Sequence, residues 1–178
     1  MPTPQIPASF AELSALDQAG FVAALDGIFE HSPWVAEHAW ASRPFADLAA
    51  LEKALVGSMW AAPPEAQHAL ICAHPELAGR AAIAGELTAE STREQSGARL
   101  DACSPEEFAQ LQDLNRRYNA RFGFPFILAV RGLDRAAIIA RFAERIQFTP
   151  EQEFKEALTQ IARIASLRLQ DRFGALTS

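Results

Sequence analysis

The sequence predicts an all-α fold, a bundle of about seven to nine helices with one extended apolar segment. Along most of the chain the apolar residues recur at steps of three and four, which is the spacing of amphipathic helices. No run of alternating apolar and polar residues is long enough to require a β-sheet. The chain has 178 residues and is 49% hydrophobic, which is enough to bury a core. We expect one domain over residues 1–178, preceded by a loose lead at residues 1–8.

Composition argues against two classes of partner. The net charge of −6 does not fit a nucleic-acid-binding surface, which is normally basic. No segment approaches the roughly 18 uncharged apolar residues that a membrane helix needs, so no membrane partner is expected. The first ten residues, MPTPQIPASF, do not resemble a secretion signal, and the last five, GALTS, carry no targeting address. These features predict a cytoplasmic protein.

Helices are expected throughout the first half of the chain. The first apolar stripe ends before Pro33, because the residue preceding a proline is steered out of the helical region. Its members are Phe21, Ala24, Leu25, Ile28 and Phe29. Helices follow over residues 35–40, 48–60 and 65–73, the last of them opened by Pro63 and Pro64 and ending at His74. Their expected core residues are Leu51, Leu55, Met59, Trp60, Ala69, Leu70 and Cys72 or Ala73.

Four further helices are expected in the second half. Residues 78–89 are weakly patterned and predict a loop with at most a short helical turn. Ser91 with Glu94 has the form of a capping box, so a helix is expected to follow. Ser104 with Glu107 is a stronger capping box that opens a helix ending near Gly123. Two more helices cover residues 135–148 and 150–169. The inward residues of these helices are Phe108, Leu111, Leu114, Tyr118, Ile138, Ile139, Phe142, Ile146, Phe154, Leu158, Ile161, Ala165 and Leu169.

His74 is the first candidate for chemistry. It stands at the end of an apolar helical run and is followed at once by Pro75. A histidine there can be structural, since it can bond the last carbonyls of the helix or interact with the helix dipole. It can also act as an acid or base, because histidine titrates near neutral pH. The small residues around it, including Ala73, Ala78 and Gly79, leave room for a pocket.

Glu94 and Arg168 each have a structural and a functional interpretation. Glu94 is the third residue after Ser91 and could simply complete a capping box; alternatively Ser91, Glu94 and Gln95 surround an anionic ligand at a helix N-terminus. Arg168 lies on the buried stripe of the last helix, three residues after Ala165. A buried guanidinium needs a partner. That partner is either a structural ion pair or a substrate carboxylate held in a bidentate clamp.

The apolar segment at residues 124–130 is the fourth candidate. Pro125 disfavours a helix through it, so an extended backbone is expected. An extended segment with no sheet to join leaves N–H and C=O groups that need partners. Those partners are water or a neighbouring loop in one interpretation, and a flat heterocycle with ureido and lactam groups in the other.

Several other types of site are not supported. The histidines and cysteines do not form a metal-binding motif, so no metal is expected. Neither a glycine-rich phosphate loop nor a serine nucleophile motif is present. Cys72 and Cys103 do not make a disulfide framework, and Cys72 is most simply a small core residue, with a catalytic thiol beside His74 as the alternative.

Taken together, these residues resemble a known enzyme family. Five motifs carry the resemblance, and their order and spacing are specific. They are SPW (32–34), HPELAG (74–79), STREQ (91–95), LNRRYNARFGFPFILAVRG (114–132) and IARIASLRL (161–169). The pattern resembles 2-oxo-4-hydroxy-4-carboxy-5-ureidoimidazoline (OHCU) decarboxylase over residues 13–169. Glu76 replaces a common Asp, and Arg99 stands where glycine is expected.

The resemblance implies an all-helical, cofactor-free carboxy-lyase, commonly a homodimer, that makes (S)-allantoin at the end of urate degradation. His74, Glu94 and Arg168 would then be catalytic. The substrate-binding residues would be Pro75, Ser91, Gln95, Phe126, Ile127, Leu128, Ala129 and Val130, the last five through their backbone. Two other functions are open, namely a different ureide lyase or hydrolase and a non-catalytic helical module that binds a small anion.

Overall fold

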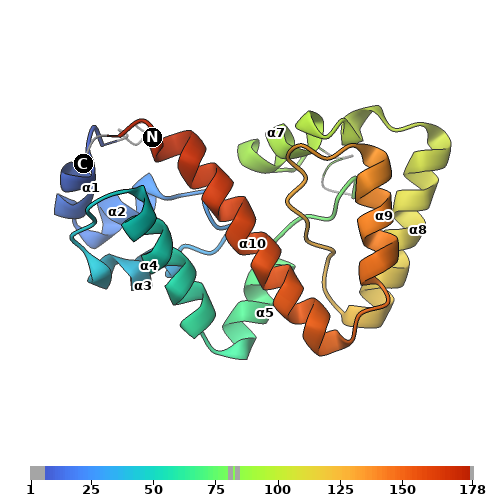
Figure 1. The fold of residues 1–178 in the computed structure, drawn as a ribbon, viewed down its shortest axis with the longest axis horizontal. Coiled ribbons are helices and arrows are strands. Elements are labelled where there is room, and N and C mark those ends of the chain that lie inside the picture. Colours follow the sequence, from blue (N-terminus) through green and yellow to red (C-terminus); the bar gives the residue numbers. More distant parts are fainter. Residues whose placement is uncertain (1–6, 80–81, 83–84, 177–178) are drawn as a thin grey trace. The chain divides into compact units, whose positions relative to one another are not determined.

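The computed structural model describes residues 7–79, 82 and 85–176 (Figure 1). Within them are nine α-helices, two short 3-10 helices and no β-strand, which confirms the all-α prediction. The chain divides into two compact units, residues 1–70 with 164–178 and residues 71–163. The single domain expected over residues 1–178 stays a prediction, and the units are described separately. Residues 1–6 of the predicted loose lead, and residues 80, 81, 83 and 84 of the predicted loop, lie outside the described residues.

The first unit contains four helices from the start of the chain, α1 (Phe10–Ala15), α2 (Gln18–Ala24), α3 (Trp34–Ala39) and α4 (Leu48–Ala61). The 3-10 helix η1 (Trp40–Ser42) follows α3. Consecutive helices contact each other, α1 with α2, α2 with α3 and α3 with α4. Their buried side chains include Phe21, Leu51, Leu55 and Met59, as the spacing predicted. The buried face of α4 therefore repeats every four residues, but Trp60, also predicted to be core, is 40% exposed.

The start of the chain differs from the prediction in two ways. Helix α1 was not expected, although Ser9 caps it by accepting from the N–H of Glu12 at 3.2 Å. Helix α2 ends at Ala24 and not near Pro33, because the chain turns where Gly27 and His31 have positive φ angles of 79° and 46°. Left-handed residues cannot continue a right-handed helix.

Helix α5 (Pro64–Cys72) leads from the first unit into the second. It begins at Pro64, as predicted from the proline pair. Leu70 and Ile71 are buried, whereas Ala69 and Cys72 are exposed. The expected burial of Ala69 and of Cys72 was therefore wrong, because the inward stripe is shifted to Leu70 and Ile71.

The second unit contains α7 (Ala89–Gly97), the 3-10 helix η2 (Leu100–Ala102), α8 (Pro105–Phe122), α9 (Arg135–Arg145) and the first part of α10 (Pro150–Phe173). Helices α8 and α9 contact each other (Figure 1). Ser104 and Glu107 form the predicted capping box of α8, and Gly123 ends that helix at a φ of 77°. Tyr118 is fully buried among the rings of Phe124, Phe126 and Phe142.

Residues 124–130 form the extended, buried segment that Pro125 predicted. Five consecutive residues are at most 7% exposed, namely Phe126, Ile127, Leu128, Ala129 and Val130. The segment has no strand partner within the described part of the chain. Its backbone groups must therefore find partners other than a β-ladder.

Candidate active site

His74 lies two residues beyond the end of α5 and is 7% exposed. Its N–H donates to the carbonyl of Ile71 at 3.1 Å, which ties it to the last turn of the helix. Pro75 follows and is half-buried. The sequence therefore predicted the position of this histidine correctly, and the side chain is largely withdrawn from solvent.

Helix α7 places Ser91, Glu94 and Gln95 differently from the prediction. Its N-cap is Thr88, whose hydroxyl accepts from the N–H of Ser91 at 3.3 Å. Ser91 is thus the third helical residue and contributes its N–H to the cap, so the predicted Ser91–Glu94 capping box was wrong. Because Thr88 is the N-cap, the interpretation of Glu94 as a capping glutamate was wrong as well. Ser91 and Gln95 are buried, one turn apart, and Glu94 is half-buried.

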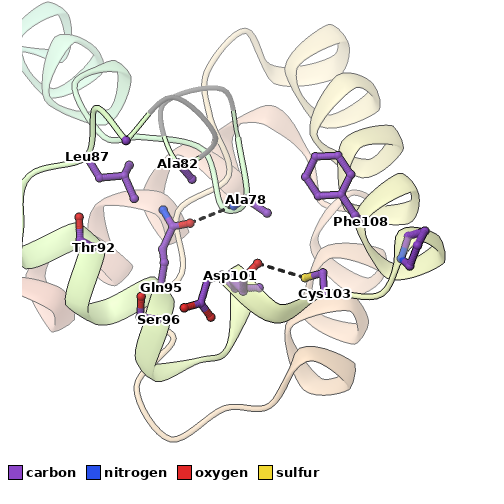
Figure 2. A pocket seen from close by; sticks show the side chains of 12 residues that line it. Ala78, Ala82, Leu87, Thr92, Gln95, Ser96, Asp101, Cys103 and Phe108 are labelled. Atoms are coloured by element: carbon purple, nitrogen blue, oxygen red, sulfur yellow. Dashed lines mark hydrogen bonds between the residues drawn. The ribbon is translucent and has the colours of Figure 1, made fainter.

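Gln95 connects α7 to the turn that follows His74. The N–H of Ala78 donates to Oε1 of Gln95 at 3.0 Å, and Nε2 of Gln95 donates to the carbonyl of Glu76 at 3.3 Å. Figure 2 shows the Gln95 side chain directed toward Ala78. The structure therefore brings one predicted binding residue into contact with the loop that contains the HPELAG motif.

A cavity of about 510 Å³ lies beside Gln95 (Figure 2). It is bordered by α7, by η2 and by the beginning of α8, and its apolar lining includes Leu87, Leu100 and Phe108. Of the predicted site residues, Gln95 is the one found among the described lining residues. The cavity and the predicted site thus share this amide side chain.

The extended segment is held by two side chains from other helices. Nη1 of Arg145 donates to the carbonyl of Ile127 at 2.6 Å, and Oε1 of Gln160 accepts from the N–H of Ala129 at 3.0 Å. Within the described residues, the backbone N–H groups of Ile127, Leu128 and Val130 have no acceptor. A buried N–H without an acceptor is uncommon in native proteins, so these groups are suited to a ligand with carbonyl oxygens.

Arg145 belongs to a buried charged cluster that was not predicted from the sequence. Its Nε donates to both carboxylate oxygens of Glu153, at 3.0 and 3.2 Å, and Tyr118 donates its hydroxyl to the same carboxylate. Burial and the neighbouring Glu153 carboxylate raise the pKa of Tyr118 well above its usual range. The spacing of residues could have predicted the burial of Arg145, because it is seven residues after Ile138 and falls on the buried stripe of α9.

Arg168, on α10 in the other unit, is 4% exposed. Its Nη1 donates to Oε2 of Glu30 at 2.8 Å and to the carbonyl of Gly27 at 2.9 Å. A structural ion pair, one of the two interpretations of Arg168, is therefore present. Glu30, 1% exposed, was not identified from sequence, because its partner lies 138 residues away.

The cysteines do not have the surroundings of a reactive thiolate. Although Cys72 is exposed, neighbouring atoms partly desolvate its thiol, and this raises the pKa of that thiol. The Cys103 thiol has a raised pKa for the same reason, assisted by the nearby Glu107 carboxylate. Since the thiolate is the nucleophile, a raised pKa disfavours a catalytic Cys72.

Comparison with known proteins agrees with the helical fold and with the motifs. The family model described as OHCU decarboxylase matches residues 14–170. The 2-oxo-4-hydroxy-4-carboxy-5-ureidoimidazoline decarboxylase of Mus musculus is 41% identical over 164 residues, 92% of each chain. The protein of the same name from Haloferax volcanii is 40% identical and covers 92% of this chain and 95% of its own.

Solved structures give the same result. A crystal structure of (S)-allantoin synthase superposes with a TM-score of 0.73 at 30% identity, covering 93% of this chain and 54% of that one. A crystal structure of an OHCU decarboxylase in the presence of (S)-allantoin has a TM-score of 0.69 at 21% identity, which supports the fold. The fold and its relatives thus define a helical carboxy-lyase. The chain belongs to the OHCU decarboxylase family.

Proposed function

We propose that the chain catalyses the decarboxylation of OHCU to (S)-allantoin in urate degradation. The observation that carries the proposal is 41% identity to a decarboxylase across 92% of both chains. The match includes all five motifs of the resemblance, since the family model spans residues 14–170. The similarity to an (S)-allantoin synthase structure supports the same product.

The reaction breaks the bond between the ring and the carboxylate, and the carboxylate carbon leaves as carbon dioxide. The electron pair moves into the adjacent imine and carbonyl system of the substrate, so the proposed mechanism needs no metal or cofactor. The resulting enol takes a proton on one face of the ring and gives (S)-allantoin. His74 is the proposed acid/base for the hydroxyl and the incoming proton, since histidines can take up and release a proton near neutral pH and this one is largely shielded from solvent.

Glu94 and Arg168 complete the proposed catalytic set. Glu94, half-buried on α7, would orient the substrate hydroxyl or the imidazole. Arg168 would bind polar oxygens of the substrate while Glu30 balances part of its charge. That balance suits the chemistry, because an arginine that held the leaving carboxylate too tightly would stabilise the substrate more than the transition state.

The remaining predicted residues bind the substrate in this proposal. Pro75 and Ser91 would border the ring, and Gln95 can use the second N–H of its amide. The segment of Phe126, Ile127, Leu128, Ala129 and Val130 would bind the ureido and lactam carbonyls. The three N–H groups without acceptors, on Ile127, Leu128 and Val130, support this role.

We also propose that the enzyme is a homodimer in the cytoplasm. Within the described residues neither cysteine forms a disulfide bond, which suits a reducing compartment. No helix within the described residues is long and apolar enough to cross a membrane. Light scattering after size-exclusion chromatography tests the dimer, and a mass of one chain, 19.4 kDa, would contradict it.

The activity is tested with freshly generated substrate, by following (S)-allantoin through its circular dichroism. We expect (S)-allantoin to form far faster than in the spontaneous reaction, and as a single enantiomer. A rate equal to the spontaneous reaction would refute the proposal. A panel of related ureides, assayed for loss of substrate, separates this activity from a different ureide lyase or hydrolase.

A further inference from the structure

The turn directly after His74 and Pro75 is held in a conformation that the backbone does not favour. Ala78 has a left-handed φ of 51°, which costs a non-glycine residue about 1–2 kcal/mol. Gly79 cannot carry a side chain, since a Cβ there would lie 2.5 Å from Cβ of Glu76. The turn therefore needs stabilising contacts from the rest of the unit.

Those contacts come from side-chain amides. The three consecutive carbonyls of the turn each accept a hydrogen bond from a different amide. Nε2 of Gln95 reaches Glu76 at 3.3 Å, Nδ2 of Asn115 reaches Leu77 at 2.9 Å and Nε2 of Gln112 reaches Ala78 at 2.6 Å. A fourth amide, Asn119, donates to the Glu76 carboxylate, and Gln95 also accepts from the N–H of Ala78.

The amides come from two helices. Gln112, Asn115 and Asn119 lie on one face of α8, at steps of three and four, and Gln95 approaches from α7. We call Gln95, Gln112 and Asn115 the amide clamp. Neutral amides can hold carbonyls without placing a net charge beside an anionic substrate, whereas lysine or arginine would add one.

Asn115 is tied to the turn through one end of its amide. It is 3% exposed, and its Oδ1 has no hydrogen-bond partner among the described residues. Its Nδ2 donates to the Leu77 carbonyl, and Leu77 is itself 6% exposed. An apolar residue in place of Asn115 would therefore leave a buried carbonyl without its donor, which typically costs about 1–3 kcal/mol.

His74 is fixed between two anchors. On one side its N–H is bound to Ile71 at the end of α5, and on the other Pro75, with its restricted φ, connects it to the clamped turn. We propose that the amide clamp positions His74 for proton transfer, an inference that rests on the proposed function. Gln95, Gln112 and Asn115 act as positioning residues in this account.

The test uses the near-isosteric variants Gln112→Met and Asn115→Leu, which keep volume and remove the hydrogen bonds. The matched control is Gln110→Met, an exposed amide on the same helix. In the active wild type, kcat is expected to fall about 10- to 100-fold in both clamp variants with KM nearly unchanged, since small misplacements cost rates of this order. The proposal would be overturned if both clamp variants had the same kcat as Gln110→Met, or if only their KM changed.

A second readout does not depend on catalysis. The chain has four histidines, so a His74→Asn variant identifies the imidazole signal of His74 in the proton NMR spectrum. That signal is expected to shift in Gln112→Met and Asn115→Leu and to stay in place in Gln110→Met. An unmoved signal in both clamp variants would refute the clamp even in an active enzyme. An inactive wild type would refute the proposed function and leave this readout to decide on the clamp.

Discussion

Each of the two units contains a buried arginine–glutamate pair, and the pairs differ in what else each arginine binds. Arg145 holds both oxygens of Glu153 and the carbonyl of Ile127, and its guanidinium lies 4.4 Å from the ring centre of Phe126. Arg168 donates to Glu30 and to the carbonyl of Gly27, two residues that lie 138 and 141 positions before it in the sequence. Burial of an ion pair therefore does not show whether its arginine is structural or functional. Measurements of stability and activity in variants of each arginine can distinguish the two roles.

Arg145→Met is expected to have the largest effect on stability. It leaves Glu153 buried without its cation, and removing one partner of a buried pair typically costs about 3–5 kcal/mol. Urea denaturation measures the loss. The double variant Arg145→Met with Glu153→Leu should recover part of it, because no charge is then left unpaired. An unchanged unfolding midpoint in the single variant would show that the cluster is not structural.

Arg168→Lys is expected to affect activity more than stability. Lysine keeps the charge beside Glu30 but loses the planar fork of donors that binds carboxylate and amide oxygens. We expect kcat/KM to fall at least about 10-fold, the loss of roughly one charge-assisted hydrogen bond, with a smaller change in unfolding free energy than in Arg145→Met. Full activity together with a lowered melting temperature would make Arg168 a second structural arginine.

Tyr118 gives a pH test of the Arg145 cluster, since it is the only tyrosine in the chain. Burial and the Glu153 carboxylate raise the pKa of Tyr118, so the folded protein keeps a proton that the unfolded chain releases above about pH 10. The unfolded state then binds fewer protons, and the unfolding free energy should fall by about 1.4 kcal/mol per pH unit. The near-ultraviolet absorbance of tyrosinate should rise only on unfolding. Ionisation near pH 10 in the folded protein would contradict the buried hydrogen bond.

The smallest expected effect concerns Arg99, an exposed arginine that contrasts with the two buried ones. It has a left-handed φ of 56°, at the position where the family resemblance led us to expect glycine. Arg99→Gly should relieve strain of about 1–2 kcal/mol, offset by the greater backbone entropy of glycine. A small rise in melting temperature is expected, whereas a fall would show that the side chain stabilises the turn.

The parts of the fold that depend on local sequence could be predicted. The capping box at Ser104, the proline start of α5 and the extended segment after Gly123 all follow from rules that act within a few residues. The capping box at Ser91 failed because Thr88, three residues earlier, forms the cap instead. Local patterns could not choose between two competing caps.

The site was only partly accessible from sequence. The motif resemblance selected His74 and Gln95 as candidates, but it did not predict the hydrogen bonds from Gln95 and from two amides of α8 to the turn after His74. Gln112 and Asn115 look like ordinary polar residues on an amphipathic helix, and their role depends on a loop 34 and 38 residues away. Arg145 could have been found by the spacing argument that identified Arg168, whereas Glu30 needed the tertiary structure.

In the proposed mechanism the buried imidazole of His74 carries the proton chemistry of the reaction. The most direct test is the initial rate of (S)-allantoin formation by His74→Asn, with its melting temperature measured alongside. The proposal predicts a fall in kcat of about 100- to 10,000-fold, typical for loss of a general acid or base, in a protein that remains folded. A folded His74→Asn variant with the wild-type rate would contradict it.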